Sequence, residues 1–127
     1  TLVGLHDDIN WDELEACQTH GDPTADNLML RADGTLVVID PIPATPAVPD
    51  LQSVDMGKIA TSVLGFERAR YGEFPIINSL TLSTLSANEF RATKYWAAVH
   101  LLRALPYIPS RKVRDDVAAL IPTALCF

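Results

Sequence analysis

Three polar residues, Asp22, Asn27 and Asp40, stand at the two ends of a short apolar stretch of the sequence. His20 and Gly21 come directly before Asp22, and four residues separate Asp22 from Asn27. A carboxylate can accept or orient the proton of a reacting hydroxyl group. Amide and carboxylate oxygens are hard ligands that suit Mg²⁺. This set therefore indicates general-base chemistry beside a magnesium ion, provided that the fold brings both ends of the stretch together.

A β-hairpin would bring the two ends together. Leu28 to Arg31 and Thr35 to Asp40 are rich in Leu, Val and Ile, as strands are. Asp33-Gly34 between them is a strong hairpin signal. Because so small a hairpin is marginal on its own, we expect it to pack on helices.

Before the polar loop, Asn10 and Glu13 match a capping arrangement and predict a short helix over about 11–18. After the hairpin, four prolines within 41–49 exclude a helix or a central strand. That segment is expected to be a stiff surface loop.

The second half of the sequence has helical periodicity. Apolar residues predict a helix over about 51–66, with Asp50 as its N-cap. A second helix is expected from Ser86 to about Leu105, with Ser86 and Glu89 as a capping box. Two further segments complete this half: an irregular one at 67–83 and a helix at about 110–120.

Composition narrows the classes of function. With 127 residues, 48% of them hydrophobic, the chain can form one domain with a core. A net charge of −6 argues against a nucleic-acid partner and against a basic membrane-binding face. Cys17 and Cys126 are too few for a disulfide framework and are expected to be reduced. Since no apolar run approaches 18 residues, we expect a soluble, cytoplasmic protein.

Other polar groups have simpler explanations. His6-Asp7 and the pair Cys17 and His20 lack the further ligands that a metal centre needs. His100 and Arg103 fall on the expected helix that begins at Ser86, where a structural role is the simpler prediction. A loop rich in Asx turns would account for Asp22 and Asn27, but it would leave Asp40 unexplained.

The pattern His20-Gly-Asp22, four residues, Asn27, a hairpin and then Ile-Asp40 resembles the aminoglycoside phosphotransferase and choline kinase group of small-molecule kinases. Asp55 resembles the Asp that opens the next helix in that group. The match covers about residues 16–66. The later helices resemble the C-terminal region of the family only in character.

The resemblance implies an α+β fold: a mostly helical kinase-like C-terminal lobe with a small hairpin after the catalytic loop. It also implies an ATP-dependent phosphotransferase that acts on a hydroxyl of a small molecule. Asp22 would be the catalytic base, and Asn27 and Asp40 would hold Mg²⁺. His20 and Asp55 would support the catalytic loop.

Two differences from protein kinases favour a small-molecule acceptor. Gly21 stands where protein kinases carry an Arg that pairs with a phosphorylated loop, so such switching is not expected. Pro41, a third difference, stands where they carry Phe, so regulation by movement of that Phe is not expected. Only 14 residues, rich in proline, separate Asp40 from Asp55. They leave little room for a platform that would bind a protein substrate.

The ATP-gripping half of such an enzyme has no counterpart in the sequence. No G-x-G-x-x-G precedes His20, and only 19 residues do. We therefore expect residues 1–127 to form a single C-terminal lobe, with the catalytic loop and hairpin at 16–40 and the helical region at 50–127. The N-terminal nucleotide lobe would be absent or supplied by a partner chain. An apolar patch is then expected near 2–5 or on the hairpin.

Alternatives to a catalytic lobe stay open. A degenerate kinase-like binding module would keep the fold without turnover, and the isolated chain is expected to be poorly active or inactive. A structural interaction domain has only the helical half in its favour. The acidic residues of that half would either meet amines of a cationic acceptor or form a solvated face: Glu67, Glu73, Glu89, Asp115 and Asp116.

Overall fold

The computed structural model describes residues 1–43, 45–46, 48–72 and 85–127. These residues are mostly helical and include one two-stranded antiparallel sheet, so the α+β expectation holds at that level. The helices are α1 (Leu2–Asp7), α2 (Gln52–Val63), α3 (Phe66–Tyr71), α4 (Ala87–Ala104), α5 (Arg111–Ala118) and α6 (Leu120–Cys126), and the strands are β1 (Leu28–Leu30) and β2 (Leu36–Val38).

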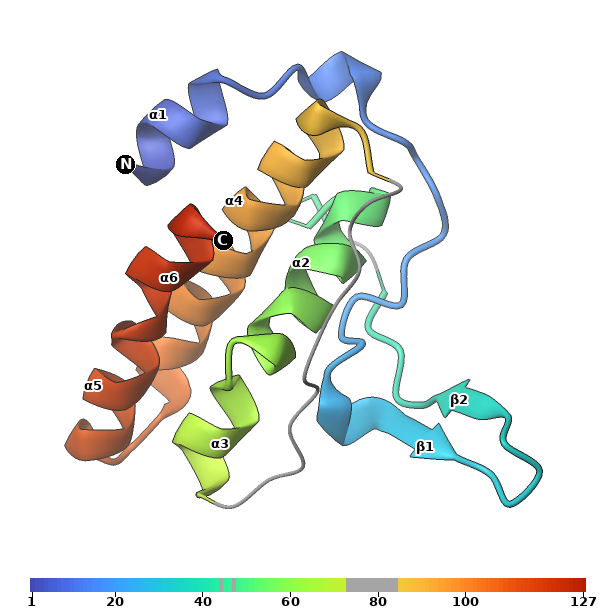
Figure 1. Ribbon diagram of the computed structural model, residues 1–127, viewed down its shortest axis with the longest axis vertical. Coiled ribbons are helices and arrows are strands. Elements are labelled where there is room, and N and C mark those ends of the chain that lie inside the picture. The colour runs from blue at the N-terminus through green and yellow to red at the C-terminus, as the bar shows by residue number, and fades with distance from the viewer. Residues whose placement is uncertain (44, 47, 73–84) are drawn as a thin grey trace.

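The core lies where α4 packs against α2 on one side and α6 on the other (Figure 1). Leu101 on α4 is fully buried there, and so is Val117 on α5. Gly57 allows α2 to approach α4 closely, because an added Cβ would lie 2.6 Å from Trp96 Cβ. The α2–α4 pair is therefore the rigid base on which the polar loop rests.

The capping prediction at Ser86 is confirmed, since its side chain accepts a hydrogen bond from the Glu89 N–H. The Glu89 carboxylate does not return to Ser86. It accepts instead from the backbone N–H of Glu15, at 3.2 Å. This contact ties the start of α4 to the segment that leads into the polar loop.

The helix predicted over 11–18 is wrong, because only a 3₁₀ turn at Trp11–Glu13 forms and Asn10 makes no side-chain cap. Beyond the turn, the backbone bonds to distant parts of the chain, with the Cys17 N–H donating to Asp50 O and the Gln52 N–H donating to Glu15 O. These long-range partners outweigh a weak local helical preference.

The second half of the chain differs from the prediction in three places. Leu51, not Asp50, is the N-cap of α2, since the Asp50 side chain accepts from the N–H and the hydroxyl of Thr19. The helix α3 occupies the start of the segment predicted to be irregular, whose residues 73–83 lie outside the described part of the chain. A last helix, α6, follows α5, beyond the helix predicted at about 110–120. Pro122 lies in the first turn of α6, where its missing N–H costs little.

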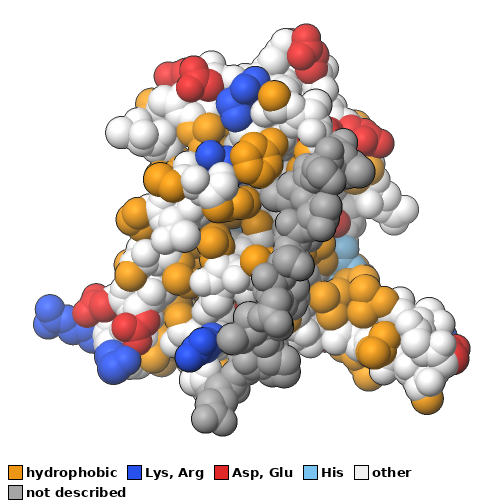
Figure 2. Space-filling model, in the orientation of Figure 1, with side chains coloured by type: hydrophobic (Ala, Val, Ile, Leu, Met, Phe, Trp, Pro, Cys, Tyr) orange, Lys and Arg blue, Asp and Glu red, His pale blue; other side chains and the backbone are white. Residues whose placement is uncertain are grey.

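The hairpin projects away from the helices (Figure 1), so the expectation that it packs on them is wrong, and its strands make their main contacts with each other. Its register pairs Leu30 with Leu36 and Leu28 with Val38, which places these four side chains on one face. Leu30 is 74% exposed and Leu36 is 59% exposed. Hydrophobic atoms gather on this part of the surface (Figure 2). The expected apolar patch is therefore present on the hairpin.

Candidate active site

The backbone before Asp22 is held by a carboxylate of α2. Asp55 accepts hydrogen bonds from the N–H of His20 at 2.7 Å and from the N–H of Gly21 at 2.8 Å. Both bonds are charge-assisted and partly buried, which makes them stronger than ordinary backbone bonds. Asp55 thus lies where the sequence interpretation expected a support for the catalytic loop.

Gly21 lets the loop approach the segment that follows the hairpin. Its φ is +81°, a left-handed conformation that favours glycine. A Cβ at this position would lie within 2.4 Å of the Ile42 carbonyl oxygen. The Ile42 N–H in turn donates to the His20 carbonyl at 2.8 Å. The loop before Asp22 and the chain just after Asp40 are therefore in contact.

The side chains of Asp22 and Asn27 are brought together as the spacing predicts. Asn27 Nδ2 donates to the Asp22 carbonyl at 2.8 Å and to Asp22 Oδ2 at 3.1 Å. Asn27 Oδ1 then remains without a donor among the described residues, so it is available as a ligand. His20 accepts from the Asp22 N–H through Nδ1, at 3.3 Å, so the ring orients the loop locally.

Asp40 lies at the base of the hairpin and directly follows Ile39, the residue that is hydrogen-bonded to Asn27. The Ile39 N–H donates to the Asn27 carbonyl at 2.9 Å, one step beyond the last strand pair. Asp40 is exposed and has a φ of +55°. Its side chain makes no contact with Asn27 in the described part of the structure.

The two candidate metal ligands fit Mg²⁺ in kind and number. Both offer hard oxygens, and Mg²⁺ in phosphoryl-transfer sites needs only one or two protein ligands, because phosphates and water supply the rest. The described residues hold no group of three or more His, Cys, Asp or Glu side chains placed for a metal ion. A site of this kind would depend on phosphate oxygens, not on a protein cage.

Lys58 is a site residue that the sequence interpretation missed. Its Nζ lies 2.9 Å from Asp22 Oδ1, with both side chains only about a quarter exposed or less. Residues three apart on a helix share a face. Since Asp55 faces the loop, Lys58 on the same face of α2 had to face it too, and this spacing was the signal available in the sequence.

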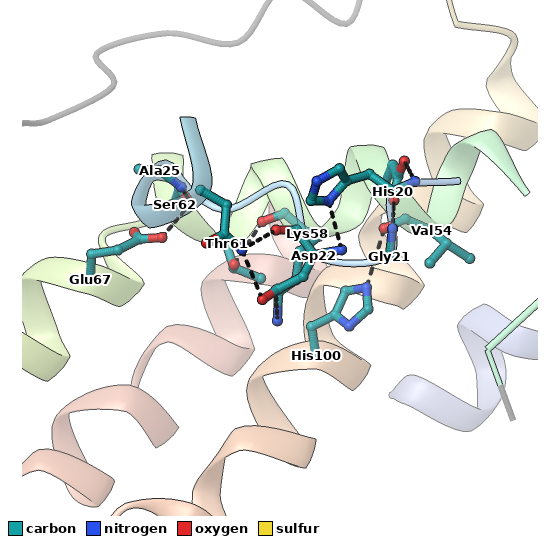
Figure 3. Close-up of polar contacts among 12 residues, drawn as sticks. His20, Gly21, Asp22, Ala25, Val54, Lys58, Thr61, Ser62, Glu67 and His100 are labelled. Atoms are coloured by element: carbon teal, nitrogen blue, oxygen red, sulfur yellow. Dashed lines mark hydrogen bonds and ion pairs between the residues drawn. The ribbon is translucent and has the colours of Figure 1, made fainter. Parts of the chain in front are cut away.

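A second anchor holds the loop beyond Asp22. The Ala25 N–H donates to the Ser62 hydroxyl at 3.1 Å, and that hydroxyl donates to the Glu67 carboxylate at 2.5 Å (Figure 3). Glu67 is 2% exposed. This side chain is therefore structural, neither part of a solvated face nor free to meet an acceptor amine. The loop is fixed to α2 on both sides of Asp22.

Asp22 opens on a cavity of about 570 Å³, a size suited to a small molecule. His100 and Arg103 of α4 line it together with Lys58. Burial, helped by the nearby positive charge of Lys58, lowers the pKa of His100 to about 4, so the imidazole is neutral at pH 7. Its Nε2 donates to the Val54 carbonyl at 3.2 Å (Figure 3), which leaves Nδ1 as an acceptor.

Comparisons with protein-family models, with curated proteins and with solved structures gave no match. A search of the described helices for a membrane-spanning segment also found none of sufficient length and apolar character.

Proposed function

We propose that this chain carries the catalytic loop of an ATP-dependent phosphotransferase that acts on a hydroxyl group of a small molecule. The observation that carries the proposal is the placement of Asp22. Its carboxylate is positioned by Asn27 and Lys58 beside a ligand-sized cavity, and its backbone is held by Asp55 and Ser62 on either side. A base positioned this rigidly suits phosphoryl transfer, in which positioning and charge neutralisation supply most of the catalysis.

In this proposal, Asp22 orients the acceptor hydroxyl and takes its proton. Asn27 Oδ1 and the Asp40 carboxylate would hold Mg²⁺, which would supply charge neutralisation for the ATP phosphates. Lys58 is a positioning residue, because its ammonium group lies 2.9 Å from Asp22 Oδ1 and holds that oxygen in place. The grip on the nucleotide is expected from a further lobe or a partner chain that covers the exposed face of the hairpin.

The test is phosphate transfer from Mg²⁺–ATP by the full-length gene product, followed as ADP release over a panel of small hydroxyl compounds. Asp22→Asn is expected to lower kcat by about 10²–10⁴-fold, the usual contribution of a general base. Asp33→Asn is the matched control, because the amide keeps the oxygen that accepts from the Thr35 N–H in the hairpin turn. Unchanged turnover in Asp22→Asn would overturn the catalytic role of Asp22.

One observation favours a second candidate, a kinase-like binding module without turnover. Both carboxylate oxygens of Asp22 already have partners, Lys58 on Oδ1 and Asn27 on Oδ2. A purely structural Asp22 would look the same. The second candidate predicts that wild-type protein binds small hydroxyl compounds in calorimetry and releases no ADP above background with any of them.

A further inference from the structure

The cavity beside Asp22 has an unusual balance of charge for this protein. The chain as a whole carries a net charge of −6. Among the described residues, the charged side chains that line the cavity are one carboxylate, Asp22, and two cations, Lys58 and Arg103. His100 adds no charge at pH 7. The wall of the cavity is therefore net positive, against the trend of the rest of the sequence.

Lys58 and Arg103 differ in how they are engaged. Lys58 is paired with Asp22 at 2.9 Å, so these two charges largely offset one another. Arg103 lies in the last turn of α4, is exposed, and has no carboxylate partner among the described residues. A cation in the last turn of a helix also interacts with the helix dipole. That interaction leaves the guanidinium donors free to bind an anionic group.

The acidic residues considered for a cationic acceptor are used elsewhere. The Glu67 carboxylate is buried against Ser62, and that of Glu89 accepts from the Glu15 N–H. Asp115 and Asp116 pair with Arg111 and Lys112 along α5. None of these four carboxylates lines the cavity, and Glu73 lies outside the described residues. Among the described residues that line the cavity, Asp22 is the only carboxylate that could bind an amine, and it is already paired with Lys58.

We propose that the acceptor is a hydroxyl compound that carries an anionic group, a carboxylate or a phosphate ester, and that Arg103 binds this group. The guanidinium fork matches both anions through two parallel hydrogen bonds. His100 Nδ1 is an acceptor suited to a second hydroxyl of the same molecule. That the ligand is the phosphate acceptor rests on the proposed function. That it carries an anionic group rests only on the residues that line the cavity.

The geometry separates this anion from the phosphates of ATP. Asn27 and Asp40, the candidate magnesium ligands, are not among the residues that line the cavity. If these two residues hold the magnesium of Mg²⁺–ATP, the nucleotide would lie on their side of Asp22. Arg103 lies on the cavity side, where the acceptor would enter.

The experiment measures binding to the full-length gene product by calorimetry without ATP. Two scaffolds are compared in matched forms: glycerate, glycerol phosphate, glycerol and aminopropanediol, and then gluconate, glucose phosphate, sorbitol and glucamine. On at least one scaffold, an acid is expected to bind about tenfold or more tightly than the neutral form, the size of a charge-assisted hydrogen bond. The carboxylate and phosphate arms show which anion is preferred, and the amines are expected to gain nothing.

Arg103→Gln is expected to remove the advantage of the acids and to leave the KM for ATP unchanged. Arg111→Gln is the matched control, since Arg111 is 90% exposed on α5 and does not line the cavity. The inference is overturned if no acid gains on either scaffold, if the gain survives Arg103→Gln, or if Arg103→Gln raises the KM for ATP instead. Arg103-dependent acid binding without any phosphate transfer would reject the proposed function and keep the ligand class.

Discussion

The two sides of the candidate site are built in different ways. Asp22 rests on α2, where Asp55, Lys58 and Ser62 all contact its loop. Asp40 stands at the base of a projecting hairpin whose strands make their main contacts with each other. Asp22 is thus fixed by helix packing, whereas the position of Asp40 depends on a few backbone bonds such as that from the Ile39 N–H to the Asn27 carbonyl. Substitutions that destabilise the helices should therefore also disturb the position of Asp22. Substitutions on the hairpin surface should leave the fold intact.

The largest contrast is expected between two leucines. Leu101 is fully buried in α4, and Leu30 is 74% exposed on β1. Leu101→Ala should lower the free energy of unfolding by about 2–5 kcal/mol, because it opens a cavity in the core. Leu30→Ala should change it by no more than about 0.5 kcal/mol. Urea denaturation measures both, and equal losses would contradict the proposed division between helices and hairpin.

Removal of the loop anchor is expected to have the next largest effect. Asp55→Ala leaves the N–H groups of His20 and Gly21 without their charged acceptor, which should cost about 2–4 kcal/mol of unfolding free energy. Asp12→Ala is the control, since Asp12 is exposed in a 3₁₀ turn. A loss in Asp55→Ala no larger than that in Asp12→Ala would show that the loop holds itself without α2.

The motif and hairpin could be predicted from the sequence because their signals are local. Asp33-Gly34 sets the turn, and the spacing of Asp22 and Asn27 already places them within one short loop. Residues recruited from a distance were missed, such as Ser62, because its role depends on Ala25 reaching α2. The helix predicted over 11–18 was wrong for the same reason, because backbone N–H groups of this segment donate to Asp50 and Glu89, which lie far along the chain. Hydrogen bonds between residues this far apart produce no characteristic residue spacing in a single sequence.

Low pH is expected to lower the stability of the fold through His100, which lines the cavity. Burial holds the pKa of folded His100 at about 4, below its ordinary 6.5. Between these values the unfolded chain binds more protons, so stability falls as pH drops from about 6.5 towards 4 and is fully present above 6.5. The loss through this residue is up to about 3 kcal/mol.

The measurement for His100 is unfolding free energy across that pH range. His100→Gln keeps a donor for the Val54 carbonyl and should flatten the slope. His6→Gln, at an exposed position in α1, should leave the slope as it is. A wild-type slope that persists in His100→Gln would assign the acid sensitivity to another group.

The smallest expected effect on stability is at the hairpin surface. Leu30 and Leu36 are directly opposite one another on β1 and β2, on the exposed apolar face. Replacing both by Thr keeps residues that favour strands and removes apolar surface from solvent contact. Unfolding free energy should change by no more than about 0.5 kcal/mol, while the fluorescence of a bound apolar dye should fall. If the double variant unfolds more easily by several kcal/mol, the hairpin face packs against the rest of the chain in solution, and it is not the exposed surface on which a nucleotide-binding lobe or partner could rest.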